Sequence, residues 1–260
     1  MKKLIIIMIM FLSLLQMAPA APPAAPPAAP PDTAAVEEAG SPWSGGVETA
    51  VTNKYLWRGM EVNEGLILQP LAWLTYQNFT FSLWSSWTLS EPKDDIKRPE
   101  VDATLTYEVE LDNFIIESYF NYYHYIDQPD APNTGELGCN LGYPLGIMTL
   151  NAGIIVDVME YSGAVYLEQK IEAEQDLSES ATVYGALTLG SGLKKFNESY
   201  FGLSKSTISL LTVEGRFTYY VTESLYLQPL VQYNKTIDTK LYDFIRKDNS
   251  CICLTLGTEF

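Results

Sequence analysis

The chain has 260 residues, with 32 Asp and Glu against 16 Lys and Arg, and its net charge is −16 at pH 7. So acidic a chain lacks the basic face that nucleic-acid binding needs, and its 3 cysteines are too few for a disulfide scaffold. Aromatic residues make up 12% of the chain, which excludes a disordered acidic protein. The sequence has no second long apolar run, which excludes a polytopic helical membrane protein. The composition does not exclude an outer-membrane β-barrel, because apolar and polar residues alternate along its strands and their mean hydropathy is near zero.

The first residues have the three parts of a secretory signal peptide. Lys2 and Lys3 form the positive region, an apolar run covers residues 4–15, and Ala18-Pro19-Ala20 has the small flanking residues of a cleavage site. The apolar run is shorter than the roughly 20 residues of a spanning helix. We therefore expect a signal peptide at residues 1–20.

Proline and alanine dominate the next segment. The run APPAAPPAAPPD favours an extended polyproline conformation that cannot join a packed core. We interpret residues 21–41 as a linker, with the alternative that it tethers the following domain to a periplasmic partner or to peptidoglycan. Residues 42–260 are then one domain.

A strict alternation of apolar and polar residues runs through that domain. Between residues 101 and 111, Val, Ala, Leu and Tyr take the odd positions, whereas Asp, Thr and Glu take the even ones. Only a strand sorts the two sets onto opposite faces. On this basis we predict about twelve strands, at residues 44–53, 66–77, 79–90, 100–112, 114–125, 135–143, 147–159, 163–175, 179–190, 204–221, 225–235 and 250–260.

The predicted connections alternate in length. Short turns are expected at residues 77–78, 112–113, 144–146, 176–178 and 222–224. The other connections are longer, at residues 54–65, 91–99, 126–134, 191–203 and 236–249, with a short one at 160–162. Short turns at one rim, long loops at the other and an even strand number predict an all-β, antiparallel transmembrane barrel. The alternative is a soluble sandwich of two sheets.

The cost of charge in hydrocarbon decides which face meets lipid. Because carboxylates facing acyl chains are costly, we expect the acid-bearing face to enclose a lumen and the apolar face to contact lipid. Large aromatic residues near the strand ends, Trp73 among them, fit interfacial belts. The pore-lining residues predicted from this register are Asp102, Glu108, Glu110, Glu117, Asp157, Glu168, Lys170, Glu172, Glu214 and Arg216.

This acidic lining has two possible consequences. An open lumen would concentrate cations and repel anions, whereas a plugged one would pair its acids internally. Arg58 lies in the first long connection beside Gly59, which would let that loop fold sharply. We take Arg58 as a constriction candidate, with a salt bridge that only holds the loop as the alternative.

Three segments resemble a known family. Tyr55-Leu56-Trp57-Arg58-Gly59 resembles the Tyr-x-x-Arg-Gly motif of the TorF-type porin family, and residues 79–86 are similar to its glycine-aromatic-x-Trp-x-Ser strand. Glu100-Val101-Asp102 resembles the family's acidic fourth strand, while Ser82 stands where the family has Gly. The family implies an outer-membrane barrel proposed to be a porin. The terminal Phe260 also resembles the signal that the barrel-assembly machinery reads.

Catalytic, cofactor and metal sites are not expected. His124 is the single histidine and no serine follows it closely, so a barrel-embedded lipase is a minor alternative. Cys251 and Cys253 lack the further ligands of a zinc site. We predict a porin-like channel of the Gram-negative cell outer membrane for small, cationic or neutral solutes. Its expected partners are lipid, lipopolysaccharide and the barrel-assembly machinery, and the main rival is a non-conducting structural barrel.

Overall fold

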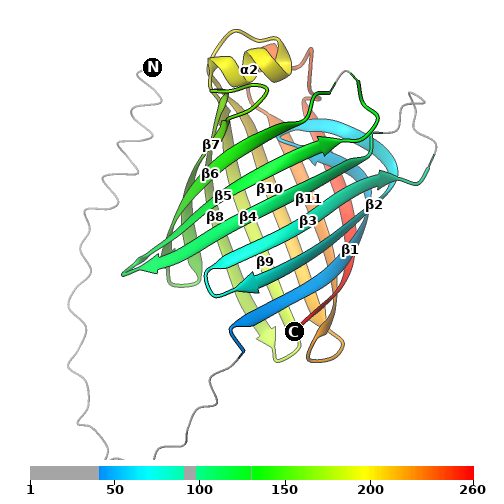
Figure 1. Ribbon diagram of the computed structural model, residues 1–260, viewed down its shortest axis with the longest axis vertical. Coiled ribbons are helices and arrows are strands. Elements are labelled where there is room, and N and C mark those ends of the chain that lie inside the picture. Colours follow the sequence, from blue (N-terminus) through cyan, green and yellow to red (C-terminus); the bar gives the residue numbers. More distant parts are fainter. Residues whose placement is uncertain (1–40, 91–97, 130) are drawn as a thin grey trace, which may run out of the picture. The chain divides into compact units, whose positions relative to one another are not determined.

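A computed structural model describes residues 41–90, 98–129 and 131–260. The expected signal peptide and residues 21–40 of the expected linker lie outside the described residues. The chain from Ser41 forms a closed antiparallel barrel (Figure 1). Its strands are β1 (Trp43–Trp57), β2 (Met60–Tyr76), β3 (Phe79–Thr88), β4 (Glu100–Leu111), β5 (Phe114–Tyr125), β6 (Thr134–Leu145), β7 (Met148–Asp157), β8 (Val165–Ser178), β9 (Ala181–Gly192), β10 (Thr207–Tyr220), β11 (Leu225–Thr236) and β12 (Asp248–Glu259).

Closure depends on the pairing of the first and last strands. β1 and β12 pair from Gly46 with Glu259 to Thr52 with Cys253, and every other strand pairs with its neighbours in the sequence. This confirms the predicted all-β, antiparallel barrel and its strand number. Within the described residues, no helix has the length and hydropathy to cross a membrane.

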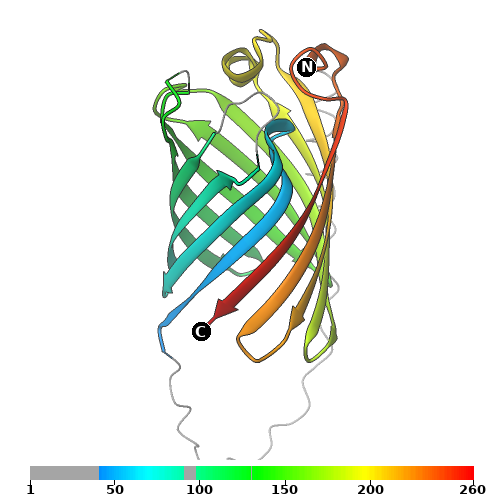
Figure 2. The ribbon, with the colours of Figure 1, turned by 90° about the vertical axis from the view of Figure 1, so that its right-hand side faces the viewer.

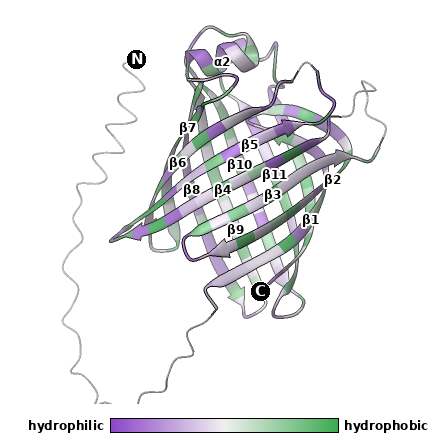
Figure 3. Ribbon diagram, in the orientation of Figure 1, coloured by the Kyte–Doolittle hydropathy of each residue, from purple (hydrophilic) through white to green (hydrophobic). Residues whose placement is uncertain are grey.

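The two faces of the barrel wall differ in polarity, and hydrophobic and hydrophilic residues alternate along many strands (Figure 3). Outward residues are large and apolar, as at Phe81 (48% exposed), Leu105 (51%) and Leu254 (48%). Their sequence neighbours turn polar side chains inward, and inward Thr104 donates a hydrogen bond to Asn121 Oδ1 of the next strand at 2.6 Å. An outward apolar face on a closed sheet is the arrangement that suits a bilayer.

The rims also differ. Tight turns join β2–β3, β4–β5, β6–β7, β8–β9 and β10–β11 at the end where β1 begins and β12 ends (Figure 2). At the other end lie the longer connections, which carry the helix α2 (Lys194–Phe201) and the short 3-10 helix η1 (Thr239–Leu241). The sequence pattern did not predict either helix.

One predicted long loop is wrong. Residues 54–65 continue β1 and β2 instead, and the two strands pair out to Trp57 and Met60 around the two-residue turn Arg58-Gly59. Both turn residues have positive φ, 46° and 88°, which Gly59 adopts without steric cost. Register shifts at Thr52/Lys54 and Tyr55/Leu56 break the alternation on which the sequence prediction relied.

Inward aromatic rings lie against glycines on neighbouring strands. Tyr119 is paired with Gly138, and an added Cβ at Gly138 would collide with the Tyr119 ring. Trp73 lies on Gly46 in the same way, with 2.5 Å from an ideal Cβ to the ring. Trp73 therefore faces the lumen, and its predicted place in a lipid-facing belt is wrong. A ring that lies along the wall leaves more of the lumen free than one that projects into it.

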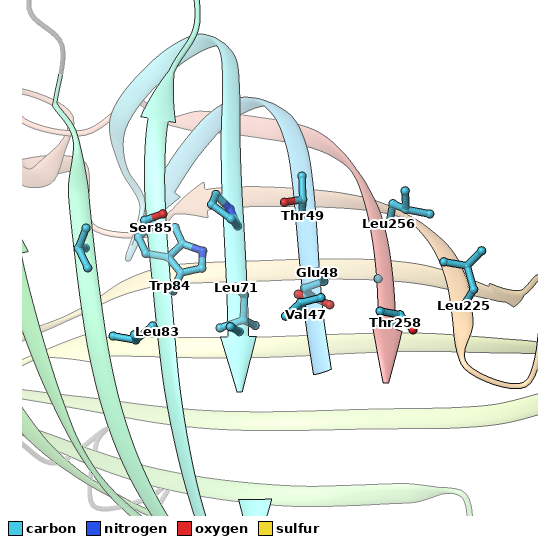
Figure 4. Close-up of a pocket in the computed structure, with 14 residues that line it drawn as sticks. Val47, Glu48, Thr49, Leu71, Leu83, Trp84, Ser85, Leu225, Leu256 and Thr258 are labelled. Atoms are coloured by element: carbon cyan, nitrogen blue, oxygen red, sulfur yellow. The ribbon is translucent and has the colours of Figure 1, made fainter. Parts of the chain in front are cut away.

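The outward face carries a shallow hollow of about 510 Å³ over β1, β2, β3 and β12 (Figure 4). Its outward lining consists largely of small side chains, including Val47, Thr49, Pro70 and Ser85. Because this surface faces away from the lumen, it is not part of the passage through the barrel.

We expect Gly138→Ala to destabilise the barrel. The added methyl group forces the Tyr119 ring away from the wall, and overpacking of this kind costs about 1–3 kcal/mol. The midpoint of urea unfolding in detergent micelles measures the change. Gly215→Ala is the matched control, because nothing lies within 4 Å of a Cβ added at outward-facing Gly215. Equal midpoints for the two variants would contradict the packing role of Gly138.

Candidate functional site

The tip of the β1–β2 hairpin is the element that distinguishes the lumen. Figure 2 shows both strands curving over at the rim opposite the tight turns. The Trp57 ring lies 5.1 Å from the Tyr200 ring and 6.2 Å from the Phe196 ring, both on α2, and 6.4 Å from Tyr123 of β5. The hairpin tip, residues 57–60, is therefore held between the barrel wall and the helix.

Arg58 fixes this tip with a buried ion pair. Its Nη1 and Nη2 donate hydrogen bonds of 2.6 and 2.8 Å to the two carboxylate oxygens of Glu136 on β6. The two side chains are 9% and 2% exposed, and Tyr123 Oη donates a further hydrogen bond of 2.7 Å to Glu136. Bidentate geometry with an added donor is what a desolvated ion pair needs to be stable.

Aromatic faces surround the same guanidinium. Its Cζ lies 4.5 Å from the Trp57 ring centroid, 4.7 Å from that of Tyr166 and 5.4 Å from that of Phe196. A ring face attracts a cation more strongly where water is excluded. The rings thus add to the binding of Arg58 without cancelling its charge.

The helix α2 closes the outer side of this cluster. Phe196 and Phe201 are 1% and 2% exposed. Asn197 Nδ2 donates to the carbonyl oxygens of Gly192 and Lys205 at 2.8 and 2.7 Å, which joins the helix to the end of β9 and to the loop before β10. The next loop is held by Lys205, whose hydrogen bond of 2.8 Å lowers the pKa of Asp238 to about 2.

The hairpin tip lies between two cavities. The outer cavity, of about 580 Å³, is lined by Tyr55, Trp57 and Met60 of the hairpin together with Tyr125 and residues of the outer loops. The inner cavity, of about 230 Å³, has Arg58 in its lining, with Asn140, Asn151, Glu168, Lys170 and Asn234. The hairpin contributes residues to the lining of both cavities.

Two of the predicted pore-lining acids on the inner side of the tip, Glu117 and Glu172, accept hydrogen bonds from neutral donors. Glu117 accepts from Asn140 Nδ2 at 2.8 Å. Glu172 accepts from Asn151 Nδ2 at 2.7 Å and from Tyr184 Oη at 2.6 Å, as well as from Lys170 at 2.7 Å. A hydrogen bond from an amide or a phenol stabilises a carboxylate without cancelling its charge.

The remaining predicted residues occupy different levels. Glu108 and Glu110 are exposed at the end of β4 near the tight-turn rim, and Arg216 lies 3.6 Å from Glu174 and 4.1 Å above the Tyr184 ring. Glu214 alternates inward with Arg216 on β10. Asp157 is 1% exposed and caps the β7–β8 loop, because it accepts hydrogen bonds from the Met159 and Tyr161 amides and from Thr134 Oγ1.

The sequence analysis missed two buried acids. Glu136 binds Arg58, and Glu100 lines the outer cavity. Both positions follow the parity of known inward neighbours, since Glu136 lies four residues before Asn140 and Glu100 two before Asp102. Parity alone could have placed them in the lumen, but it could not have paired Glu136 with a residue 78 positions away.

Residues considered for catalysis or metal binding do not converge. His124 is exposed on β5, Cys139 is exposed on β6, and Cys251 and Cys253 are free thiols on β12. In the described part of the chain, no group of three or more His, Cys, Asp or Glu residues is arranged to hold a metal ion.

Comparison with solved structures shows that several porins share the fold of this barrel. The KdgM porin superposes with a TM-score of 0.52 at 11% identity, covering 84% of this chain and 99% of that one. The NanC porin gives 0.53 at 11% identity over 82% and 98% of the two chains. A KdgM porin solved in complex with disordered oligogalacturonate gives 0.51 at 11% identity, over 84% and 99%. These likenesses establish the fold.

Sequence comparisons add no family. No protein-family model matches the chain, and no curated protein matches it. The resemblance to the TorF-type family therefore stays a prediction, while the porin fold is shown. A closed barrel of this fold with an apolar outward face belongs in the outer membrane.

We expect Arg58 and Glu136 to be strongly coupled. In a double-mutant cycle of Arg58→Ala and Glu136→Ala, the coupling free energy should be about 2–3 kcal/mol, because either single change leaves a buried charge without its partner. Urea unfolding in detergent micelles provides the measurement. The control cycle is Lys205→Ala with Asp238→Ala, whose lysine is 49% exposed, and for which we expect less than about 1 kcal/mol. Similar values for both cycles would refute the anchoring role.

Proposed function

We propose that the protein is a narrow porin-like channel for passive diffusion of small solutes, with a preference for cations. The observation that supports this most directly is the bonding of the lumenal acids. Lys170 pairs with Glu172, and Arg216 lies beside Glu174. Glu117 accepts its hydrogen bond from an amide, and none of the ion pairs found among the described residues includes Glu117, Glu168 or Glu214. The lumenal acids therefore outnumber the bases that pair with them. A low-dielectric wall strengthens the field of such charges, which concentrates cations and repels anions.

The hairpin tip is the proposed constriction. It lies between the outer and inner cavities and carries Arg58, whose charge is matched by Glu136. A solute passing the tip therefore meets a nearly neutral, aromatic-lined passage, and it meets the acidic wall farther inward. On this view the tip limits size, whereas Glu168 and Glu172 set charge preference.

The charge of the lumen separates this chain from one of its structural neighbours. The KdgM porin has been solved with oligogalacturonate, a chain of carboxylate-bearing sugars. A lumen rich in carboxylates would repel such a polyanion. We therefore propose cationic and neutral solutes for the present protein and do not carry the ligand of the neighbour over to it.

The proposed surroundings follow from the two rims and the outward face. Lipid would cover the apolar outward face, and lipopolysaccharide would adjoin the rim with the longer loops. The C-terminal strand β12, which ends at Glu259 before Phe260, would be recognised by the barrel-assembly machinery during insertion.

A non-conducting barrel is the second candidate. The observation that favours it is the anchoring of the hairpin tip inside the lumen by Arg58 and Glu136. A permanent plug would leave the protein a structural component of the envelope. Conductance across a planar bilayer separates the two candidates, because only the channel gives single-channel steps.

We predict that reversal potentials in a KCl gradient will show cation preference. The double variant Glu168→Gln/Glu172→Gln should lower the ratio of cation to anion permeability several-fold, because it removes charge from the wall without changing its shape. The matched control is Glu223→Gln in the exposed β10–β11 turn. Anion preference in the natural protein, or an unchanged ratio in the double variant, would overturn the proposed selectivity.

Arg58→Ala tests the constriction. Removing the side chain should enlarge single-channel conductance and increase cation preference, because the tip loses both bulk and a positive charge. Lys205→Ala in an exposed outer loop is the control. If Arg58→Ala lowers only the temperature of unfolding and leaves both channel properties unchanged, the ion pair holds the hairpin and does not shape the passage.

A further inference from the structure

Aromatic side chains that keep part of their surface exposed line the outer cavity. Phe196 and Tyr166, in the cluster next to this cavity, are only 1% exposed. The aromatic residues of the lining itself are all half-buried, and they are Tyr55, Trp57, Tyr125, Tyr161 and Tyr200. A molecule in the cavity would therefore meet ring surface that the protein leaves uncovered.

Three of these rings form a connected surface that runs from an outer loop to the hairpin tip. The Tyr161 ring of the β7–β8 loop lies 4.9 Å from the Tyr200 ring of α2, which lies 5.1 Å from the Trp57 ring. The interplanar angles are 57° and 53°, so neither pair is stacked face to face. Tilted rings cover each other less than stacked rings do, and their faces stay partly available to a ligand.

A network of fixed polar groups occupies another part of the same lining. Arg246 Nη2 donates to Glu61 Oε1 at 2.9 Å, and Lys54 Nζ donates to Glu61 Oε2 at 2.8 Å. Arg246 also lies 3.5 Å from Glu64. These contacts hold the groups in place without exhausting them, because a guanidinium has five N–H donors and a carboxylate has about four lone-pair sites.

The charges at this cavity balance. Among the described residues of the lining, Glu61, Glu64 and Glu100 are acidic, whereas Arg98 and Arg246 are basic. Lys54 adds a third positive charge through its ion pair with Glu61. A site with so little net charge favours neither a cation nor an anion. Its volume of about 580 Å³ lies in the range of small-molecule sites.

We propose that the outer cavity binds a neutral saccharide. A sugar ring has faces of C–H groups, which suit the negative face of an aromatic ring, and an edge of hydroxyl groups, which both donate and accept hydrogen bonds. The rings of Trp57, Tyr161 and Tyr200 would contact the former, and Glu61 and Arg246 the latter. An apolar ligand fits less well, because it would cover those two polar groups without giving them hydrogen bonds.

The aromatic surface also continues toward the lumen. The Tyr55 ring lies 5.2 Å from that of Trp84, which is paired with Asp102 on the inward face of β3. Binding in the outer cavity needs only the hairpin and the outer loops. That the bound saccharide then becomes a solute of the channel rests on the proposed function.

Isothermal titration of the full barrel, in a detergent without a sugar headgroup, tests the proposal. The probes are maltotriose, cellotriose, xylotriose, galactotriose and triacetylchitotriose, with trigalacturonate as the charged comparison. At least one neutral trisaccharide should show saturable binding, and trigalacturonate should bind more weakly than it does. Tyr161→Ala should weaken that binding about fivefold. Tyr242→Ala makes the same change at an exposed loop tyrosine outside the lining and should leave the affinity unchanged.

Arg246→Gln keeps the test decisive if Tyr161→Ala does not fold. The Arg246 side chain is 54% exposed, and its replacement should weaken saccharide binding about fivefold, whereas Lys240→Gln in the same loop should not. Binding of none of the neutral probes, tighter binding of trigalacturonate, or equal affinities in each variant and its control would overturn the proposal. Cation-preferring conductance without saccharide binding would overturn this site alone, and saccharide binding without conductance would overturn the channel while supporting the site.

Discussion

A bilayer gives a backbone no partner for its N–H and C=O groups, and this constraint governs the structure. A sheet meets it only by closing on itself, here through the pairing of β1 with β12. Closure gives every strand one face toward lipid and one toward an enclosed space, so each polar side chain has only one favourable direction. The polarity of the wall, the inward carboxylates and the ring–glycine packing at Tyr119 and Gly138 follow from that division.

The enclosed space then poses its own problem, because a barrel of this size encloses more volume than the wall side chains fill. The chain places the β1–β2 hairpin and α2 at the outer end, and these bring apolar rings inside. A guanidinium brought in with them must be neutralised where water is scarce. Glu136 does this from the opposite wall with two short hydrogen bonds, so a single ion pair both positions the hairpin and permits its burial.

Period-two patterning predicted all twelve strands, since lipid on one side and polar lumen on the other leave a mark at every second residue. It failed where that mark is absent. Beyond Thr52 the β1–β2 hairpin bends inward through two register shifts. The alternation of polar and apolar residues is lost there, and for this reason residues 54–65 were predicted to be a loop. The odd or even position of a residue predicts which face of the wall it lies on, but it does not predict its partner. The sequence could therefore place Arg58 in the lumen but could not identify Glu136 as its ion-pair partner. The helix α2 was not predicted because it is short. Its buried apolar residues, Phe196 and Phe201, pack against the same small cluster as the hairpin.

The distribution of partners along the lumen gives it two electrostatic zones. At the outer end, Arg58 neutralises Glu136. Asp157 accepts hydrogen bonds from backbone amides of the β7–β8 loop. Farther inward, carboxylates such as Glu117 are held in place by neutral donors. The inner zone also contains the Lys170–Glu172 ion pair, but Glu117 keeps its charge there without a base. Under the proposed function, the outer zone would determine which solutes fit, and the inner zone would determine which sign of charge is favoured.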